Sequence, residues 1–117
     1  MAWVQMVAEE AATGKLSEVY RRVRDGLAGA NWLKVLGEAP GKGAILSFTV
    51  DGAHAHDVAQ ILDRFGVAVR AGTHCAEPLM RRFGVTSSAR ASFALYNTEA
   101  EADAFVEALT RTQAFFA

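Results

Sequence analysis

The 117-residue sequence has a single cysteine, two prolines and no excess of charge of either sign. One cysteine excludes an internal disulfide framework and a cysteine-rich zinc site. Twelve basic and thirteen acidic residues give a net charge of −1, which argues against a nucleic-acid partner because phosphate contacts need a basic face. The lone thiol, together with the lack of a basic and then apolar N-terminal segment, favours a cytoplasmic protein.

Long apolar runs are also missing, since no stretch approaches the roughly 18 residues of a membrane span. We therefore expect no membrane partner. Apolar residues nevertheless make up 51% of the chain and charged residues 21%. At this length that composition is sufficient to bury a core without disulfides, which predicts one compact domain.

A cluster of three glycines and one proline at residues 37–43 predicts a loop. It separates an N-terminal helical segment, residues 1–36, from a mixed segment, residues 43–117. Within the first segment, apolar residues at helical spacing alternate with a charged face and predict an amphipathic helix. These apolar residues are Leu16, Val19, Tyr20, Val23 and Leu27.

Beyond the loop, the apolar residues switch repeatedly between the period of a strand and the period of a helix. Thr98 and Glu101 form a capping box, which marks the start of the last helix. Because three short strands cannot bury both faces of a sheet, we expect an α+β fold: a small, largely antiparallel sheet with helices packed on one face. The predicted strands are 46–50, 67–70 and 90–95, and the predicted helices are 58–65, 77–83 and the segment after 98.

Cys75 is the strongest candidate for chemistry. It lies in the loop 71–76, immediately before a predicted helix. A helix N-terminus, and the nearby Arg70 and His74, favour the thiolate, which is the nucleophilic form of cysteine. The alternative is a buried cysteine that packs as a small hydrophobic residue. The residues alone leave both interpretations open.

Arg90 lies on the polar side of a predicted strand, where its guanidinium can bind a carboxylate through two parallel hydrogen bonds. The alternative is a solvated or salt-bridged arginine. His74 either positions or deprotonates a nearby group, or is a backbone-bonded loop histidine. His54 and His56 diverge on a helix, so we interpret them as helix-start residues and expect no metal site.

The segments RAGTHCAEPLM at 70–80 and ARAS at 89–92 form a specific pair. Residues 43–116, which contain them, resemble the C-terminal small domain of the group II (SufS-type) cysteine desulfurases, pyridoxal-phosphate enzymes of the class V aminotransferase family. The resemblance implies the small-domain fold of fold-type I pyridoxal-phosphate enzymes. Thr73 departs from that pattern, because the family has a histidine at this position.

The resemblance implies that Cys75 takes sulfur from a substrate cysteine as a persulfide while alanine is released. It also implies that Arg90 holds the substrate carboxylate and that Arg70 and His74 shape the loop. The family's cofactor domain, with its Schiff-base lysine, has no counterpart in this sequence. We therefore expect no cofactor in this chain, and pyridoxal phosphate only if a separate large-domain partner supplies it.

These expectations describe an incomplete desulfurase with a sulfur-transfer or accessory role, whose partners are a pyridoxal-phosphate subunit or a sulfur acceptor protein. Two alternatives stay open: a catalytically empty remnant that acts as an oligomerisation or interaction module, and an autonomous enzyme that uses Cys75 without a cofactor. Surface left bare by a lost cofactor domain favours a homo-oligomer. Residues 2–25 also resemble the opening helix of the carboxymuconolactone-decarboxylase family, which implies a natural fusion or a rearranged gene.

Overall fold

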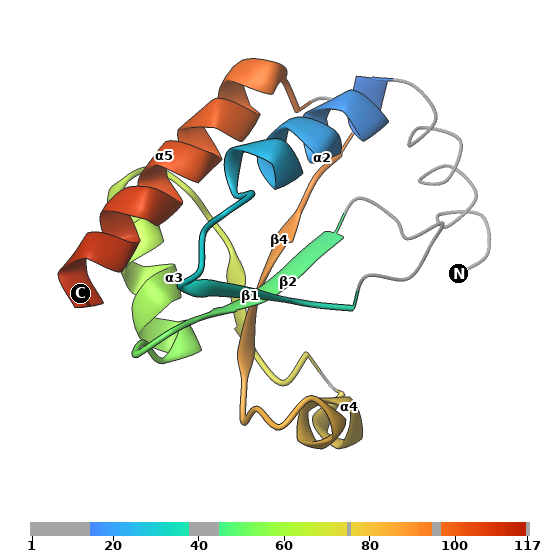
Figure 1. Ribbon diagram of the computed structural model, residues 1–117, viewed down its shortest axis with the longest axis vertical. Coiled ribbons are helices and arrows are strands. Elements are labelled where there is room, and N and C mark those ends of the chain that lie inside the picture. Colours follow the sequence, from blue (N-terminus) through green and yellow to red (C-terminus); the bar gives the residue numbers. More distant parts are fainter. Residues whose placement is uncertain (1–14, 38–44, 75, 95–96, 117) are drawn as a thin grey trace.

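The chain forms a four-stranded antiparallel sheet with the strand order β1-β2-β4-β3, and amphipathic helices pack against it (Figure 1). The computed structural model describes residues 15–37, 45–74, 76–94 and 97–116. The strands are β1 (Leu33–Leu36), β2 (Ile45–Val50), β3 (Arg70–Gly72) and β4 (Ser88–Ser92). The helices are α2 (Lys15–Gly26), α3 (Ala55–Arg64), α4 (Glu77–Arg82) and α5 (Glu99–Phe116). This arrangement confirms the predicted α+β fold.

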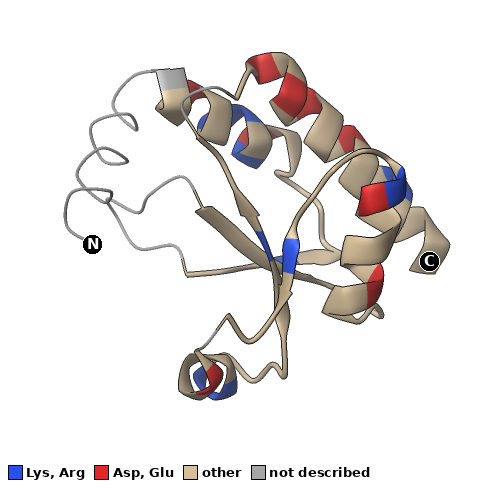
Figure 2. Ribbon diagram, turned by 180° about the vertical axis from the view of Figure 1, so that it is seen from behind, with Lys and Arg blue, Asp and Glu red and all other residues tan. Residues whose placement is uncertain are grey.

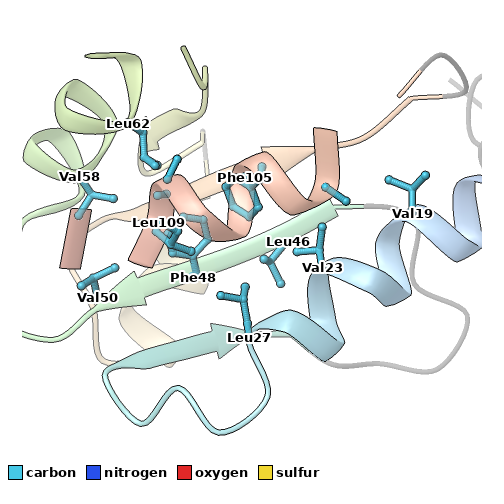
Figure 3. Close-up of a cluster of buried hydrophobic side chains, with 14 residues drawn as sticks. Val19, Val23, Leu27, Leu46, Phe48, Val50, Val58, Leu62, Phe105 and Leu109 are labelled. Atoms are coloured by element: carbon cyan, nitrogen blue, oxygen red, sulfur yellow. The ribbon is translucent and has the colours of Figure 1, made fainter. Parts of the chain in front are cut away.

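The core lies between one face of the sheet and the helices α2, α3 and α5 (Figure 3). On β2, Leu46, Phe48 and Val50 are buried, as the period-two pattern predicts. The Phe48 ring packs edge-on against Phe105 of α5, with the ring centroids 6.2 Å apart. Ala89 continues the same apolar face onto β4. The helices α2, α3 and α5 therefore cover one face of the sheet, and the other face carries polar residues together with the buried Leu36, which lies opposite Ser47.

The N-terminal elements belong to this same packing. Helix α2 lies beside α5 (Figure 1), and Arg22 donates two hydrogen bonds to the Asp103 carboxylate, at 2.7 and 2.9 Å. Strand β1 pairs with β2 in the register Leu33↔Val50. The sequence pattern does not predict β1, because a segment of four residues carries no decisive periodicity and only its pairing with β2 defines it.

Two predicted strands are displaced along the sequence. The strand expected at 67–70 is observed at Arg70–Gly72, and the one expected at 90–95 is observed at Ser88–Ser92. Pairing decides both positions, because Ala71 lies opposite Ala89 and small residues give little alternating signal. Phe93, which was assigned to the strand, lies just after it and packs against the core.

The predicted helix starts are confirmed in their hydrogen bonds. The Glu101 N–H donates to Thr98 Oγ1 at 3.2 Å, and the Thr98 hydroxyl donates to the Glu101 carboxylate at 3.3 Å. At α3, His54 is the N-cap, and its Nδ1 accepts from the His56 N–H at 3.1 Å. In the described part of the chain, no helix is both long and apolar enough to cross a membrane.

Candidate functional site

The face of the sheet that α2, α3 and α5 leave uncovered carries two arginines side by side. In the ladder, Arg70 of β3 lies opposite Arg90 of β4, and Ser47 of β2 lies opposite Arg90 on the other side. Directly opposed residues share one face of a sheet. Ser88 shares it as well, because it lies two positions from Arg90 on the same strand. We call Ser47, Arg70, Ser88 and Arg90 the arginine face.

The charges of the arginine face are not balanced by described carboxylates. Neither Arg70 nor Arg90 forms an ion pair with an acidic residue in the described ranges. Figure 2 shows basic segments on the neighbouring strands β3 and β4, whereas the acidic segments gather on the helices. Like charges directly opposite in a sheet repel each other. A bound anion would relieve that repulsion.

Arg90 also has an unsatisfied donor. Its Nε is buried and has no hydrogen-bond partner among the residues that the structure describes. A guanidinium donates in a planar fork that matches the two oxygens of a carboxylate, and buried donors are normally paired. The geometry leaves this donor available to a carboxylate, and the carboxylate-binding role of Arg90 stays a prediction.

Ser88 is the polar residue that the sequence analysis missed on this face. Its side chain is completely buried, and its Oγ has no partner within the described part of the chain. The signal was present in the sequence, since a serine two residues before Arg90 points to the same side of a strand. Ser88 was not considered because the predicted strand started at residue 90, two residues after the observed start of β4.

His74 is tied to the first residue of β4. Its Nε2 lies 3.0 Å from the Ser88 carbonyl oxygen. Because a carbonyl only accepts, Nε2 carries the proton, and Nδ1 is the nitrogen that remains for a proton-accepting role. Two residues on, the Ala76 N–H donates to the Thr73 carbonyl at 2.9 Å. His74 is thus a backbone-bonded loop histidine, and a role of its Nδ1 toward a nearby group stays a prediction.

The structure brings three of the four predicted site residues to one region. Arg70, Arg90 and His74 all lie on β3, β4 and the segment that follows β3. The fourth, Cys75, lies outside the described residues. The preceding residue, His74, is bonded to the Ser88 carbonyl, and the role of Cys75 itself stays a prediction.

The described residues do not fit a pyridoxal-phosphate site. Lys34 is the one lysine whose side chain is described, and it is exposed on the outer strand β1, whereas a Schiff-base lysine must reach a bound cofactor. Among the described residues, no group of three or more histidine, cysteine, aspartate and glutamate side chains is placed to hold a metal ion. His54 caps α3 and His56 lies in its first turn, so both are helix-start residues as predicted. Their side chains do not diverge, however: the rings stack with centroids 5.2 Å apart, because His54 lies before the helix in an extended conformation.

Three hollows of the surface are found among the described residues. One of about 280 Å³ is lined by Val50, Val58 and Ser87, among others. Another of about 200 Å³ is lined by Phe93 and Asn97, and a third of about 330 Å³ by Asp63 and Ala71, among others. No predicted site residue lines any of the three. The candidate site is therefore a sheet face on which Ser88 and the Arg90 Nε are buried, and none of these hollows supplies an enclosed pocket for a small ligand there.

Comparison with known proteins identifies the family. A model of the family described as aminotransferase class-V matches residues 1–105. The chain belongs to the class-V aminotransferase family. It is 39% identical over 111 residues to a probable cysteine desulfurase of Xylella fastidiosa, and 40% identical over 116 residues to a probable cysteine desulfurase 2 of Mycobacterium leprae. These alignments cover 95% and 97% of the chain.

Solved structures give the same result for the fold. The crystal structure of the Escherichia coli cysteine desulfurase CsdA in an S-sulfonic acid form matches 92% of this class-V chain, with a TM-score of 0.81 and 34% identity. An apo cysteine desulfurase of Thermococcus onnurineus matches 87% of it, with a TM-score of 0.75 and 33% identity. The fold of this chain is therefore one that cysteine desulfurases contain.

The class-V chain spans about a quarter of the length of these relatives. It covers 27% of the Xylella protein, 28% of the Mycobacterium protein and 26% of the Escherichia chain. The family match begins at residue 1, so the N-terminal segment belongs to the same family as the rest. The resemblance of residues 2–25 to carboxymuconolactone decarboxylases, and the fusion it implied, are wrong.

Proposed function

We propose that these residues form the sulfur-handling, C-terminal small domain of a group II (SufS-type) cysteine desulfurase, with Cys75 as the residue that carries the persulfide. Arg90, assisted by Arg70, binds the carboxylate of the sulfur donor. The pyridoxal-phosphate site is supplied from outside these 117 residues, in the same or another chain. By itself the chain accepts and passes on sulfur and does not complete a desulfurase cycle.

The observation that carries this proposal is the buried Nε of Arg90, which has no partner among the described residues and lies opposite Arg70, on the strand to which His74, the residue before Cys75, is bonded. A carboxylate satisfies the buried donor and offsets the repulsion between the two guanidinium groups at once. An amino-acid sulfur donor carries such a carboxylate. The relatives, which are named as cysteine desulfurases, supply independent support for that class of donor.

The accepting step needs only Cys75 and a sulfur donor. The thiolate attacks the outer sulfur of a persulfide, R–S–SH; a new S–S bond forms, the old one breaks, and the donor leaves as the thiolate R–S⁻. Charge and sulfur balance, and no external oxidant is required. Because Cys75 is the single cysteine, any sulfur added to a thiol of the chain is added there.

The test is mass spectrometry of the protein after incubation with a persulfide donor. We expect the peptide that contains Cys75 to gain the mass of one sulfur atom, and Cys75→Ser to gain nothing. Absence of the added sulfur on the folded wild-type protein, or a Cys75 that resists alkylation, would contradict the proposal. Absorbance near the pyridoxal band, measured with and without added cofactor, tests the proposal that the pyridoxal-phosphate site lies outside these residues. A bound internal Schiff base would overturn that proposal.

We further propose that the chain is a cytoplasmic homo-oligomer or is covered by a partner, because the arginine face is uncovered by the described helices. Leu79 and Phe115 also expose 47% and 62% of their surface, more than large apolar side chains usually do. Sedimentation at high concentration is expected to show a species larger than one chain. A protein that self-associates yet takes no sulfur would favour the alternative, a module for oligomerisation or interaction without chemistry.

A further inference from the structure

His74 has an unusual backbone conformation for a residue with a side chain. Its φ is +54°, and in the described part of the chain it is the one residue other than glycine with a positive φ. A Cβ atom disfavours this left-handed region, although histidine enters it more readily than most residues do. Such a conformation persists where surrounding interactions determine it. Two hydrogen bonds around His74 do so.

The first bond runs from the ring to the strand. The β3–β4 ladder ends at the pair Gly72↔Ser88, and the His74 Nε2–H donates to the carbonyl of that same Ser88 at 3.0 Å. The ring of His74 therefore adds one side-chain hydrogen bond between the segment after β3 and the start of β4, just beyond the last backbone pair. The second bond joins Ala76 N–H to Thr73 O at 2.9 Å, so the chain reverses direction between these residues.

The ring bond also fixes which nitrogen carries the proton. A carbonyl oxygen has no hydrogen to give, so the neutral ring must carry its proton on Nε2 and its lone pair on Nδ1. The protonated ring keeps the same Nε2–H bond. Nδ1 is then the one ring nitrogen that can accept a proton or a hydrogen bond from the loop.

We propose that His74 is a positioning residue for the sulfur-accepting loop: its Nε2–H bond to the Ser88 carbonyl ties the loop to β4 at His74 and leaves Nδ1 as the acceptor of the ring. This inference rests on the proposed function, because the position of the loop matters for sulfur transfer only if Cys75 takes sulfur. In this proposal Nε2 donates the structural hydrogen bond to Ser88, so Nε2 cannot act as a general base.

The first test reads the ring directly in the wild-type protein and needs no substitution. Long-range ¹H–¹⁵N spectra at a pH where the ring is neutral should show His74 protonated on Nε2 and unprotonated on Nδ1. A His74 ring protonated on Nδ1 would overturn the proposal. The measurement does not depend on sulfur chemistry, so it separates this inference from the proposed function.

The second test compares substitutions by amide hydrogen exchange of Ala76. His74→Ala removes the ring bond and should speed the exchange of the Ala76 N–H about three- to tenfold, the range expected for one net hydrogen bond. His74→Gln places an amide donor near the position of Nε2 and should restore most of the protection. The matched control is His56→Ala, an exposed histidine of α3, which should leave Ala76 unchanged.

The rates of sulfur loading complete the comparison. His74→Ala should slow the gain of sulfur on Cys75, and His74→Gln should recover it. If His74→Ala leaves the exchange of Ala76 unchanged, or if His74→Gln fails to protect Ala76, the positioning role is wrong. If the ring and exchange data agree with the proposal while wild-type Cys75 takes no sulfur, the proposed function fails and the positioning of the loop stands.

Discussion

On the helix-covered face of the sheet, Phe48 is completely buried and touches its apolar neighbours on every side. One residue earlier, on the opposite face, Ser47 lies across from Arg90, whose Nε is buried without a described partner. The first face satisfies its side chains within the chain, whereas the second leaves donors and charges unsatisfied. Unsatisfied groups of this kind reduce stability and persist where a ligand or partner uses them.

The largest effect should follow from breaking the packed face. Phe48→Ala removes a ring that is 0% exposed and packs against Phe105, and it should lower the free energy of unfolding by about 3–5 kcal/mol. Denaturant unfolding measures this loss. Thr49→Val, on the same strand but the opposite face, is the matched control and should change stability by less than about 1 kcal/mol. Equal effects at the two positions would erase the distinction between the faces.

Arg90→Met should raise the stability of the protein, whereas Phe48→Ala lowers it. Methionine removes the buried, unpaired Nε and the charge opposite Arg70, so we expect the free energy of unfolding to rise by about 1–2 kcal/mol. Arg21→Met, on the exposed side of α2, makes the same change in net charge and should leave stability nearly unchanged. A destabilised Arg90→Met protein would show that Arg90 serves the fold instead of a ligand.

A smaller loss is expected at the start of the helix that covers the packed face. Thr98→Ala removes the hydroxyl that accepts from the Glu101 N–H at the start of α5 and should cost about 1 kcal/mol. Thr98→Ser retains the hydroxyl and should retain most of the stability. Thermal unfolding compares the three proteins. If alanine and serine behaved alike, the capping bond would contribute nothing.

The smallest effect concerns the outer surface of the helix layer. Arg22 holds the pKa of the Asp103 carboxyl below its usual range, chiefly by hydrogen bonding and then by its charge. A lowered pKa in the folded state stabilises the protein above the unfolded-state pKa of about 3.9. That contribution disappears as the pH falls through the lower folded-state value. Asp103→Asn should therefore weaken the acid dependence of the melting temperature, and high salt should reduce the difference.

The sequence predicted the packed face better than the arginine face. The strand pattern of Leu46, Phe48 and Val50 and the capping box at Thr98 are local signals, and the structure confirms both. The opposition of Arg70 and Arg90 depends on the register of two strands that are distant in sequence, and small residues such as Ala71 and Ala89 give no pattern from which to read it.

The individual site residues were predicted from the loop and from the family resemblance, but their contacts were not. Nothing in the local sequence shows that the His74 ring bonds the Ser88 carbonyl, because fourteen residues separate the two. Ser88 was missed because the boundary of β4 was displaced by two residues. The residue types therefore indicated which side chains could take part in chemistry. Their contacts could not be predicted, because those contacts depend on the pairing of strands that are distant in sequence.

The central claim is that Cys75 accepts sulfur beside a carboxylate site formed by Arg90 and Arg70. The most direct test measures the rate at which Cys75 gains one sulfur atom from two donors, cysteine persulfide and the persulfide of 2-mercaptoethanol, which lacks a carboxylate. We expect wild-type protein to react faster with the carboxylate-bearing donor, and Arg90→Met to react equally with both. Equal wild-type rates, or a Cys75 that gains no sulfur from either donor, would contradict the claim.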